Sequence, residues 1–368
     1  MKKLNSNKLP IAELHVHAEG GTVTPEILEY LAKQNNMPVP NEIFGPNSSI
    51  KYNKGDFLNF LEVYDEVDQY IRTAADLKYV LYDYLRRSAD EGVIYTELTC
   101  SPDHFKSLRT TFSEVKDISA HNKVTNKKPI YRESDLNYKE FVTTIAEAID
   151  AARQDFGIEA RVLMVLLRHN GPEKAAELLD NILAYPHPYV VGLNLAGDEV
   201  NFPAILFADA FSRAKQHGLK LTAHAGEHAD AKSIIGAVKV LQLDRVGHGV
   251  ASAKDEGVMA FLKENNIGLE VCPSSNVHLG VISSMQEHPF RKLYDYGIAC
   301  SLNSDDPPYF ETTIGNEFNI AKTHWNFTDV ELLKITRSTI KMAFCEASLK
   351  DKLLSQIDLY EEMSRNQV

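Results

Sequence analysis

Runs of apolar residues bounded by turn-forming residues recur along the chain and predict eight β-strands. These runs lie at residues 11–17, 92–100, 160–169, 189–197, 220–227, 244–250, 267–276 and 298–307. Between them, apolar positions repeat with a helical period, for example at 76–92, 138–157 and 256–266. Because strands alternate with helices, we expect an α/β fold, and eight repeats favour a closed (β/α)8 TIM barrel over an open sheet.

Two stretches exceed the minimal barrel unit. Residues 33–75, between the first two strands, carry aromatic residues Phe57, Phe60 and Tyr64 at helical spacing, which predicts additional helices there. We interpret this stripe as core packing, with a substrate lid as the alternative. Residues 103–137 are polar and show little periodicity, so we treat them as an insertion after the second strand. The other segments fit the barrel, and we expect one domain over 1–368.

Composition and charge narrow the class of protein. Hydrophobic residues make up 44% of the chain and charged residues 24%, which is typical of a globular protein with a large core. The net charge of −12 argues against a nucleic-acid or membrane-surface partner, since both are polyanionic, and favours a small-molecule ligand. The first residues, MKKLNSNKLP, lack the apolar region of a secretory signal.

The four cysteines also bear on location. They are Cys100, Cys272, Cys300 and Cys345, and none has CxxC spacing. A chain of this size does not need disulfides, so we expect reduced thiols and a cytoplasmic location. Cys272 is interpreted as a packing residue.

Polar residues gather where the predicted strands end. His15 and His17 alternate at the end of the first strand, so their side chains share one face. The other such residues are His224, Glu227, His248, Asp305 and Asp306. In a (β/α)8 barrel the carboxyl ends of the strands form one rim, which is where the reacting groups lie.

Three imidazoles and a carboxylate suit zinc, which binds histidine nitrogen and aspartate oxygen and keeps a position for water. A zinc-bound water has a pKa near ~7 and supplies hydroxide at neutral pH. The same ligands also accept iron, cobalt or manganese. Glu227 could then pass a proton, while His248 and Asp306 could orient the water or bind a substrate nitrogen.

Each motif also has a plain structural interpretation. An isolated HxH pair is more often packing than a metal site, Glu227 could be solvated, and a buried His248 could simply bond to the backbone. The sequence SDDPP is common at helix starts. It is the joint placement of these motifs on one rim that favours a site. His228 is expected to neighbour the site without belonging to it, and solvated or structural roles are expected for His104, His121, His187, His217, His278, His288 and His324.

Six motifs, in order, resemble the adenosine and adenine deaminase family. They are ELHVHAEG, VGLNLAGDE, LTAHAGE, RVGHG, VCPSSN and SLNSDDPPYF, and the resemblance runs from residue 12 to about residue 345. It implies a metal-dependent barrel hydrolase that acts on the 6-amino group of a purine. The other zinc deaminase pattern, HxE with PCxxC, is absent from the sequence.

The resemblance also implies roles for individual residues. It makes His15, His17, His224 and Asp305 the zinc ligands, Glu227 the donor to purine N1, and His248 the group that orients and deprotonates the water. Asp306 would contact the hydroxide and a ring nitrogen, and the Gly197 amide would meet N3. The residues expected to contact substrate are His17, Glu19, Gly197 and Asp306.

The substrate expected from these motifs is adenosine, together with 2′-deoxyadenosine, converted to inosine and ammonia. Glu19 stands where animal adenosine deaminases carry aspartate, but glutamate occurs there in bacterial members of both branches, so it does not separate nucleoside from base. The alternatives are adenine, converted to hypoxanthine, or a modified adenine nucleoside. A purine-binding protein without catalysis is a further alternative, which Glu227, His248 and Asp306 argue against.

Overall fold

The computed structural model describes residues 8–105 and 136–365. Most of the polar insertion expected at 103–137, including His121, lies outside the described residues. In the part of the chain that the structure describes, no helix combines the length and apolar character needed to cross a membrane.

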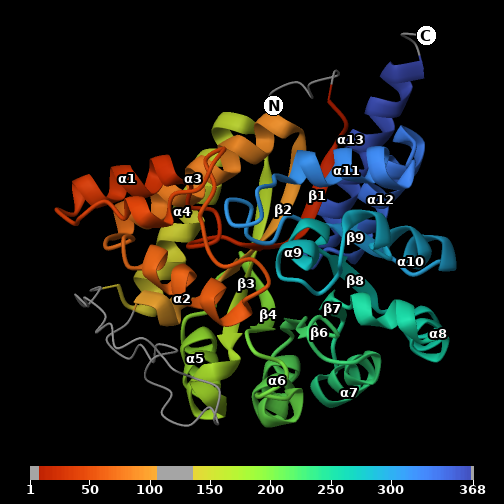
Figure 1. The fold of residues 1–368 in the computed structure, drawn as a ribbon, viewed down its shortest axis with the longest axis horizontal. Coiled ribbons are helices and arrows are strands. Elements are labelled where there is room, and N and C mark those ends of the chain that lie inside the picture. The colour runs from red at the N-terminus through yellow and green to blue at the C-terminus, as the bar shows by residue number, and fades with distance from the viewer. Residues whose placement is uncertain (1–7, 106–135, 366–368) are drawn as a thin grey trace.

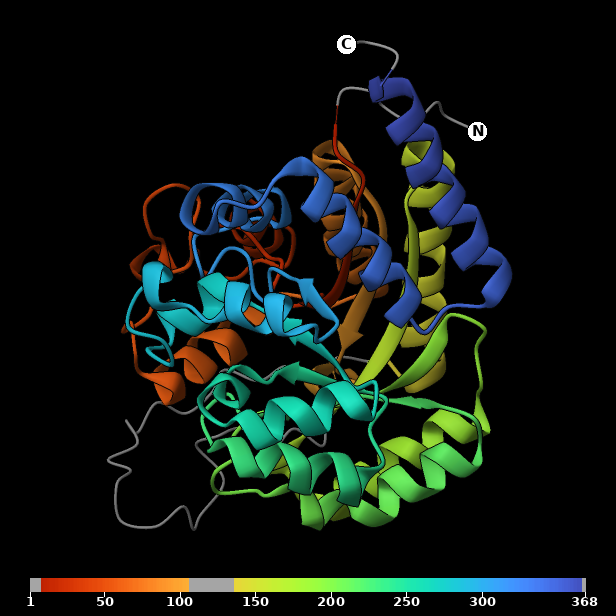
Figure 2. The same cartoon turned by 90° about the vertical axis from the view of Figure 1, so that its right-hand side faces the viewer.

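The strands form a parallel barrel surrounded by helices (Figures 1 and 2). One sheet has the order β1-β2-β3-β4-β5 and the other β6-β7-β8-β9, with every pair parallel. The strands are β1 Ile11–His17, β2 Val93–Cys100, β3 Glu159–Leu167, β4 Val190–Ala196, β5 Lys220–Leu221, β6 His224–Ala225, β7 Arg245–His248, β8 Gly268–Val271 and β9 Cys300–Leu302. A parallel bridge between Val16 and Asp305 joins the first strand to the segment after the last. The (β/α)8 prediction is confirmed.

Three predicted strands differ from those observed. Residues 220–227 form two short strands, because Lys220–Leu221 pairs with β4 whereas His224–Ala225 pairs with β7. The strand predicted at 267–276 ends at Val271, because Pro273 starts a helix and removes a backbone donor. The strand predicted at 298–307 is observed only over Cys300–Leu302, and the acidic segment after it is irregular.

The described helices follow the predicted alternation. They are α1 Pro25–Gln34, α2 Phe57–Asp68, α3 Ala74–Glu91, α4 Tyr138–Phe156, α5 Gly171–Ala184, α6 Ala208–Gln216, α7 Ala231–Leu241, α8 Glu256–Glu264, α9 Pro273–His278, α10 Phe290–Tyr296, α11 Ile314–Trp325, α12 Asp329–Met342 and α13 Ala347–Arg365. Short 3₁₀ helices are η1 Asn41–Ile43, η2 Pro102–Phe105, η3 Arg168–Asn170, η4 Ala204–Phe207, η5 Val250–Lys254 and η6 Met285–Glu287. Helices predicted at 76–92, 138–157 and 256–266 correspond to α3, α4 and α8.

Local chemistry explains where these helices start and stop. A capping box of Thr73 and Asp76 begins α3, and Asn137 with Glu140 begins α4. Gly157 ends α4 with φ of 81°, a left-handed conformation that glycine adopts without strain. The helix α8 ends slightly earlier than predicted, and Asn266 beyond it has φ of 54°.

The aromatic stripe of α2 packs inward, as the core interpretation predicts. Phe60 and Tyr64 are buried, and the Phe60 ring lies 5.4 Å from the ring of Tyr309. Tyr64 stacks on Tyr309 at 5.7 Å. These rings also line the pocket described below, so α2 forms both core and pocket wall.

A separate apolar cluster joins β1 to the carboxyl-terminal helices. Ala12 and Leu14 of β1 cluster with Leu333 of α12 and Leu353 of α13. Figure 2 shows α13, in dark blue, lying along the outside of the barrel.

Candidate metal centre and active site

The structure brings the four expected metal ligands to one point at the carboxyl ends of the strands. His15 and His17 lie at the end of β1, His224 begins β6, and Asp305 follows β9. The ligand atoms of the three histidines lie within 4.8 Å of one another. Oδ1 of Asp305 is 3.5 Å from Nε2 of His15 and 3.4 Å from Nε2 of His17. Tetrahedral zinc with bonds of about 2 Å separates donor atoms by roughly 3.3 Å, so this spacing suits one ion.

Asp305 is held in an unusual backbone conformation. Its φ is 63°, in the left-handed region that residues other than glycine seldom adopt. Two backbone hydrogen bonds to β1 impose it: His17 N–H donates to the Asp305 carbonyl at 2.9 Å, and Asp305 N–H donates to the His15 carbonyl at 3.2 Å. The strained backbone therefore directs this carboxylate toward the histidines of β1.

Several atoms that face this point have no hydrogen-bond partner among the described residues. They are Nε2 of His15 and His224 and Oδ1 of Asp305, all buried. Buried polar atoms are almost always paired, so a convergent set of unpaired ones is the pattern that metal ligands leave. The donor set therefore fits a divalent cation such as zinc.

The other ring nitrogen of His15 is held by a carboxylate on the side away from the metal position. Its Nδ1 lies 2.9 Å from Oε2 of Glu270, which directs Nε2 toward the centre. Burial lowers the pKa of His15, but the nearby carboxylates of Asp305 and Glu270 outweigh this and raise the pKa to about 10. A cation bound at Nε2 would replace the proton that Asp305 favours there.

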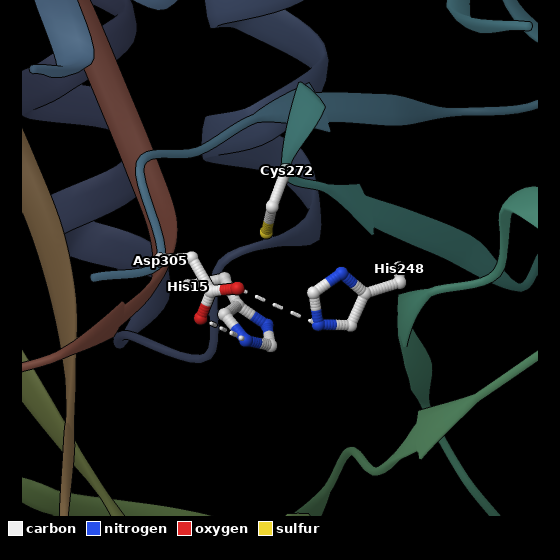
Figure 3. A group of neighbouring side chains, drawn as sticks. All are labelled: His15, His248, Cys272 and Asp305. Atoms are coloured by element: carbon white, nitrogen blue, oxygen red, sulfur yellow. Dashed lines mark ion pairs between the residues drawn. The ribbon is translucent and has the colours of Figure 1, made fainter. Parts of the chain in front are cut away.

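A second possible ligand group contains Cys272, and Figure 3 shows it with His15, His248 and Asp305. The Cys272 thiol lies 3.5 Å from the Glu270 carbonyl, to which it donates. Burial and the carboxylate of Asp305 raise the pKa of this thiol well above its usual range. Because metals bind the thiolate, Cys272 is the weaker candidate, which agrees with its interpretation as a packing residue.

Glu227 lies between two imidazoles of the site. Its Oε2 is 3.4 Å from Nδ1 of His224 and 3.5 Å from Nε2 of His248. Nε2 of His228 lies 3.6 Å from the other carboxylate oxygen. Glu227 therefore faces the pocket with both oxygens close to proton donors.

The loop that carries Glu227 is fixed by a carboxylate from another strand end. Glu199 accepts hydrogen bonds from the backbone N–H groups of Gly226 at 2.9 Å and Ala229 at 2.7 Å, and also from that of His228. Nη2 of Arg168 donates to the His224 carbonyl at 2.7 Å. This backbone is therefore held in position on both sides.

Asp306 sits beside Asp305 in a crowded acidic environment. Burial raises its pKa, and the carboxylates of Asp305, Glu227 and Glu19 raise it further, well above the usual range. Asp305 behaves oppositely, because nearby imidazoles overcome burial and hold its pKa well below the usual range. Adjacent carboxyls with opposite shifts can serve as proton holder and charged ligand. A Cβ on Gly21 would lie 2.1 Å from Oδ1 of Asp306, which explains that glycine.

A pocket of about 670 Å³ opens onto this cluster. It is lined by His17, Glu19, Phe57, Phe60, Leu61, Tyr64, Asp65, Ser101, Val165, Leu167, His169, Ala196, Gly197, His224, Glu227, Leu279, Asp305 and Asp306. All four residues expected to contact substrate are in this lining. No lysine or arginine is among the described residues that line it. Oε1 of Glu19 accepts a hydrogen bond of 2.6 Å from the backbone N–H of Ser101.

Sequence reasoning missed the residues behind the site. Glu270 and Arg245 lie in β8 and β7, and the Arg245 side chain bonds to Glu270 at 2.6 Å and to Glu97 at 2.5 Å. The available signal was a carboxylate in the middle of the apolar run IGLEV. His169, which lines the pocket, was counted only as part of a strand. His288, grouped with solvated or structural histidines, is buried.

The model of the adenosine deaminase family matches residues 10–360. The chain belongs to this family. Among curated relatives, the adenine deaminase of Sinorhizobium fredii is 33% identical over 346 residues, covering 94% of this chain and 97% of that protein. The family assignment confirms the resemblance drawn from the six motifs.

Solved structures of similar fold include two related barrels. The adenine deaminase from Arthrobacter aurescens matches with a TM-score of 0.82 at 27% identity, covering 96% of this chain and 99% of that one. An amidohydrolase from Burkholderia ambifaria, solved with bound zinc, matches with a TM-score of 0.81 at 22% identity over 100% of this chain and 96% of its own. The second likeness is one of fold alone.

Proposed function

We propose that this protein is a zinc-dependent adenine deaminase, which converts adenine and water to hypoxanthine and ammonia. The observation that carries the proposal is the convergence of three histidines and two adjacent aspartates on one pocket at the barrel rim. The relatives named adenine deaminase, which align along nearly the whole chain, support adenine. They favour the alternative substrate inferred from the sequence over adenosine, the first expectation.

His15, His17, His224 and Asp305 would hold the metal, because their unpaired atoms and short spacings suit one ion. When bound, zinc acidifies a water molecule and so supplies hydroxide near neutral pH. His17 also lines the pocket, so it would contact both ion and substrate.

Glu227, Asp306 and His248 supply the proton chemistry of the proposal. Hydrolysis adds the water oxygen to C6 and breaks the bond from C6 to the amino nitrogen, which leaves as ammonia. Glu227 would protonate the ring at N1, which makes C6 more electrophilic. Asp306, with its raised pKa, would hold or pass a proton near the departing amine. Nε2 of His248 lies 3.5 Å from Oε2 of Glu227, so His248 would stand beside the proton donor and the attacking water.

The pocket lining suits a small neutral base. Aromatic side chains of α2 provide a flat apolar wall, and the backbone of Gly197 lies at the end of β4 where N3 of a purine would meet its amide. The carboxylates of Glu19 and Asp65 can accept the ring N–H of a free base. The described lining has no lysine or arginine to bind a phosphate and carries the carboxyl groups of Glu19 and Asp65, so a nucleotide is disfavoured.

A turnover panel tests the proposal. Zinc-loaded protein is assayed for ammonia release from adenine, adenosine, 2′-deoxyadenosine and AMP, with kcat/KM measured for each. Adenine should be the preferred substrate, and removing the metal should abolish turnover until zinc is restored. A higher kcat/KM for adenosine would overturn the substrate assignment. Bound zinc with no turnover of any aminopurine would favour the alternative of a purine-binding protein without catalysis.

A further inference from the structure

A line of buried hydrogen bonds connects the backbone of α10 to His248. The Phe290 N–H lies 3.2 Å from Nδ1 of His288, and Nε2 of His288 lies 3.2 Å from Oδ1 of Asn276. Nδ2 of Asn276 lies 3.2 Å from Nδ1 of His248. All four residues are buried, and neither Asn276 nor His288 is among the residues that line the pocket.

The direction of these bonds follows from the first one. A peptide N–H can only donate, so Nδ1 of His288 is an unprotonated acceptor and the ring proton is on Nε2. Burial lowers the pKa of His288 to about 3, in agreement with a neutral ring. The Nε2–H of His288 needs an acceptor, which fixes the Asn276 oxygen on that side. The Asn276 amide N–H₂ therefore faces His248.

The same reasoning fixes the proton on His248. An amide N–H₂ only donates, so Nδ1 of His248 accepts, and the ring carries its proton on Nε2. That nitrogen lies 3.5 Å from Oε2 of Glu227 and 3.8 Å from Oδ2 of Asp305. Figure 3 shows the His248 ring with Nε2 turned toward the Asp305 carboxylate.

We propose that Asn276 and His288 are positioning residues that lock His248 in the Nε2–H tautomer, so that His248 donates a hydrogen bond into the reaction centre. Its catalytic consequence rests on the proposed function. A neutral ring with Nε2–H cannot take a proton at that atom, so His248 orients and stabilises the attacking oxygen without accepting its proton. The water proton then passes to a carboxylate of the pocket. This replaces the expectation that His248 deprotonates the water.

The two positioning residues are themselves held rigidly. The Asn276 N–H donates to the Cys272 carbonyl at 3.0 Å, and its carbonyl accepts from Ile282 N–H at 2.9 Å. The His288 ring packs on Trp325 with centroids 5.3 Å apart. Nε1 of Trp325 donates to the Met285 carbonyl at 3.0 Å. The first two of these bonds fix the backbone of Asn276, and its side-chain amide is held by its bonds to His248 and His288. The His288 ring cannot rotate without losing its packing on Trp325.

The first test reads the tautomer directly. In the zinc-loaded protein with ¹⁵N-labelled histidine, the His248 signals are identified by their loss in His248→Gln. The expected spectrum has an unprotonated Nδ1 and a protonated Nε2 for His248, and the same pattern for His288. A protonated Nδ1 on His248 would overturn the proposal. This measurement needs no turnover, so it can fail while adenine deamination holds, and it can succeed if the substrate assignment fails.

The second test inverts the tautomer. In Asn276→Asp, a carboxylate accepts from both histidines, which moves the His248 proton to Nδ1 and removes the donor from the site. We expect the ¹⁵N pattern of His248 to reverse and kcat to fall by about 10²-fold or more, with KM little changed and zinc retained. Unchanged kcat in a variant whose tautomer has reversed would refute the catalytic role. If Asn276→Asp does not fold, the wild-type spectrum and the His288 pair below decide.

The His288 variants separate positioning from packing. In His288→Gln, the amide can accept from Phe290 and donate to Asn276, so kcat and the His248 signals should stay close to wild type. His288→Leu fills the space but lets the Asn276 amide rotate, so kcat should fall and His248 should show both tautomers. The surface histidine His217 provides a control, since His217→Gln should change neither. Equal losses in the Gln and Leu variants would assign His288 to packing.

Discussion

Nδ1 of His15 lies 2.9 Å from Oε2 of Glu270, and this contact joins the candidate metal centre to the barrel interior. The other oxygen of Glu270 accepts from Arg245 at 2.6 Å and from Thr222 at 2.9 Å. Arg245 in turn pairs with Glu97. A metal ligand is thus oriented by charged groups of β2, β7 and β8, which belong to both sheets.

Glu270→Gln should weaken zinc binding. The glutamine loses the negative charge that supports the His15 ring, and loss of such a supporting group costs about 10–100-fold in metal affinity. The measurement is the zinc dissociation constant by competition with a chromophoric chelator. Glu264→Gln, on the exposed side of α8, is the matched control and should leave the constant unchanged. An unaltered affinity in Glu270→Gln would mean that His15 does not need this partner.

Arg245→Met should destabilise the whole fold. It leaves Glu97 and Glu270 buried without their cation and removes the guanidinium that lies 3.5 Å above the Phe344 ring. Breaking a buried ion pair in this way costs about 3–5 kcal/mol, to be read from urea unfolding. Arg291→Met breaks partly exposed pairs with Asp295 and Glu331 and should cost about 1 kcal/mol. Similar losses in the two variants would contradict the importance of the buried network.

Glu227→Gln should retain zinc but lose turnover. The amide keeps the shape of the side chain and cannot deliver a carboxylic proton to the ring, so kcat for adenine should fall by about 10²–10⁴-fold. Turnover is measured together with metal content. His228→Gln, next in sequence but outside the proposed chemistry, should keep most of its activity. Near-normal turnover in Glu227→Gln would remove this residue from the mechanism.

Glu317 should make stability depend on pH. It is fully buried, and burial raises its pKa from 4.5 to about 7 despite hydrogen bonds from Ser274 and Thr312. A carboxyl group whose pKa is higher in the folded state binds more protons when folded. The shifted pKa therefore adds its full share to the free energy of unfolding below about pH 4.5. This share, about 3 kcal/mol in all, is lost as the pH rises through about 7.

The measurement compares Glu317→Gln with wild type. The glutamine does not titrate, so the unfolding free energy of wild type should fall relative to the variant between about pH 4.5 and 7. Glu29→Gln, on the exposed side of α1, controls for removing one negative charge. A difference between wild type and Glu317→Gln that stays constant with pH would show that folding leaves the pKa of Glu317 unchanged.

The sequence pattern was most informative where one physical rule acts locally. Apolar runs located every strand region, and alternation correctly put His15 and His17 on one side of β1. Strand ends were less accurate, because they depend on partners. The segment at 220–227 divides where its neighbour changes, and Pro273 shows how one residue in an apolar run can begin a helix.

The amino-acid sequence by itself predicted the barrel, its rim and the residues expected to hold a metal. The alternation of apolar and polar residues and the common direction of parallel strands leave few other arrangements. Only the tertiary structure decided which groups support the residues of the site. Glu270 and Arg245 are far from His15 along the chain, and Asn276 and His288 are far from His248. Hydrogen bonds and charges act over a few ångströms in space, so the state of an imidazole depends on neighbours that folding alone brings to it.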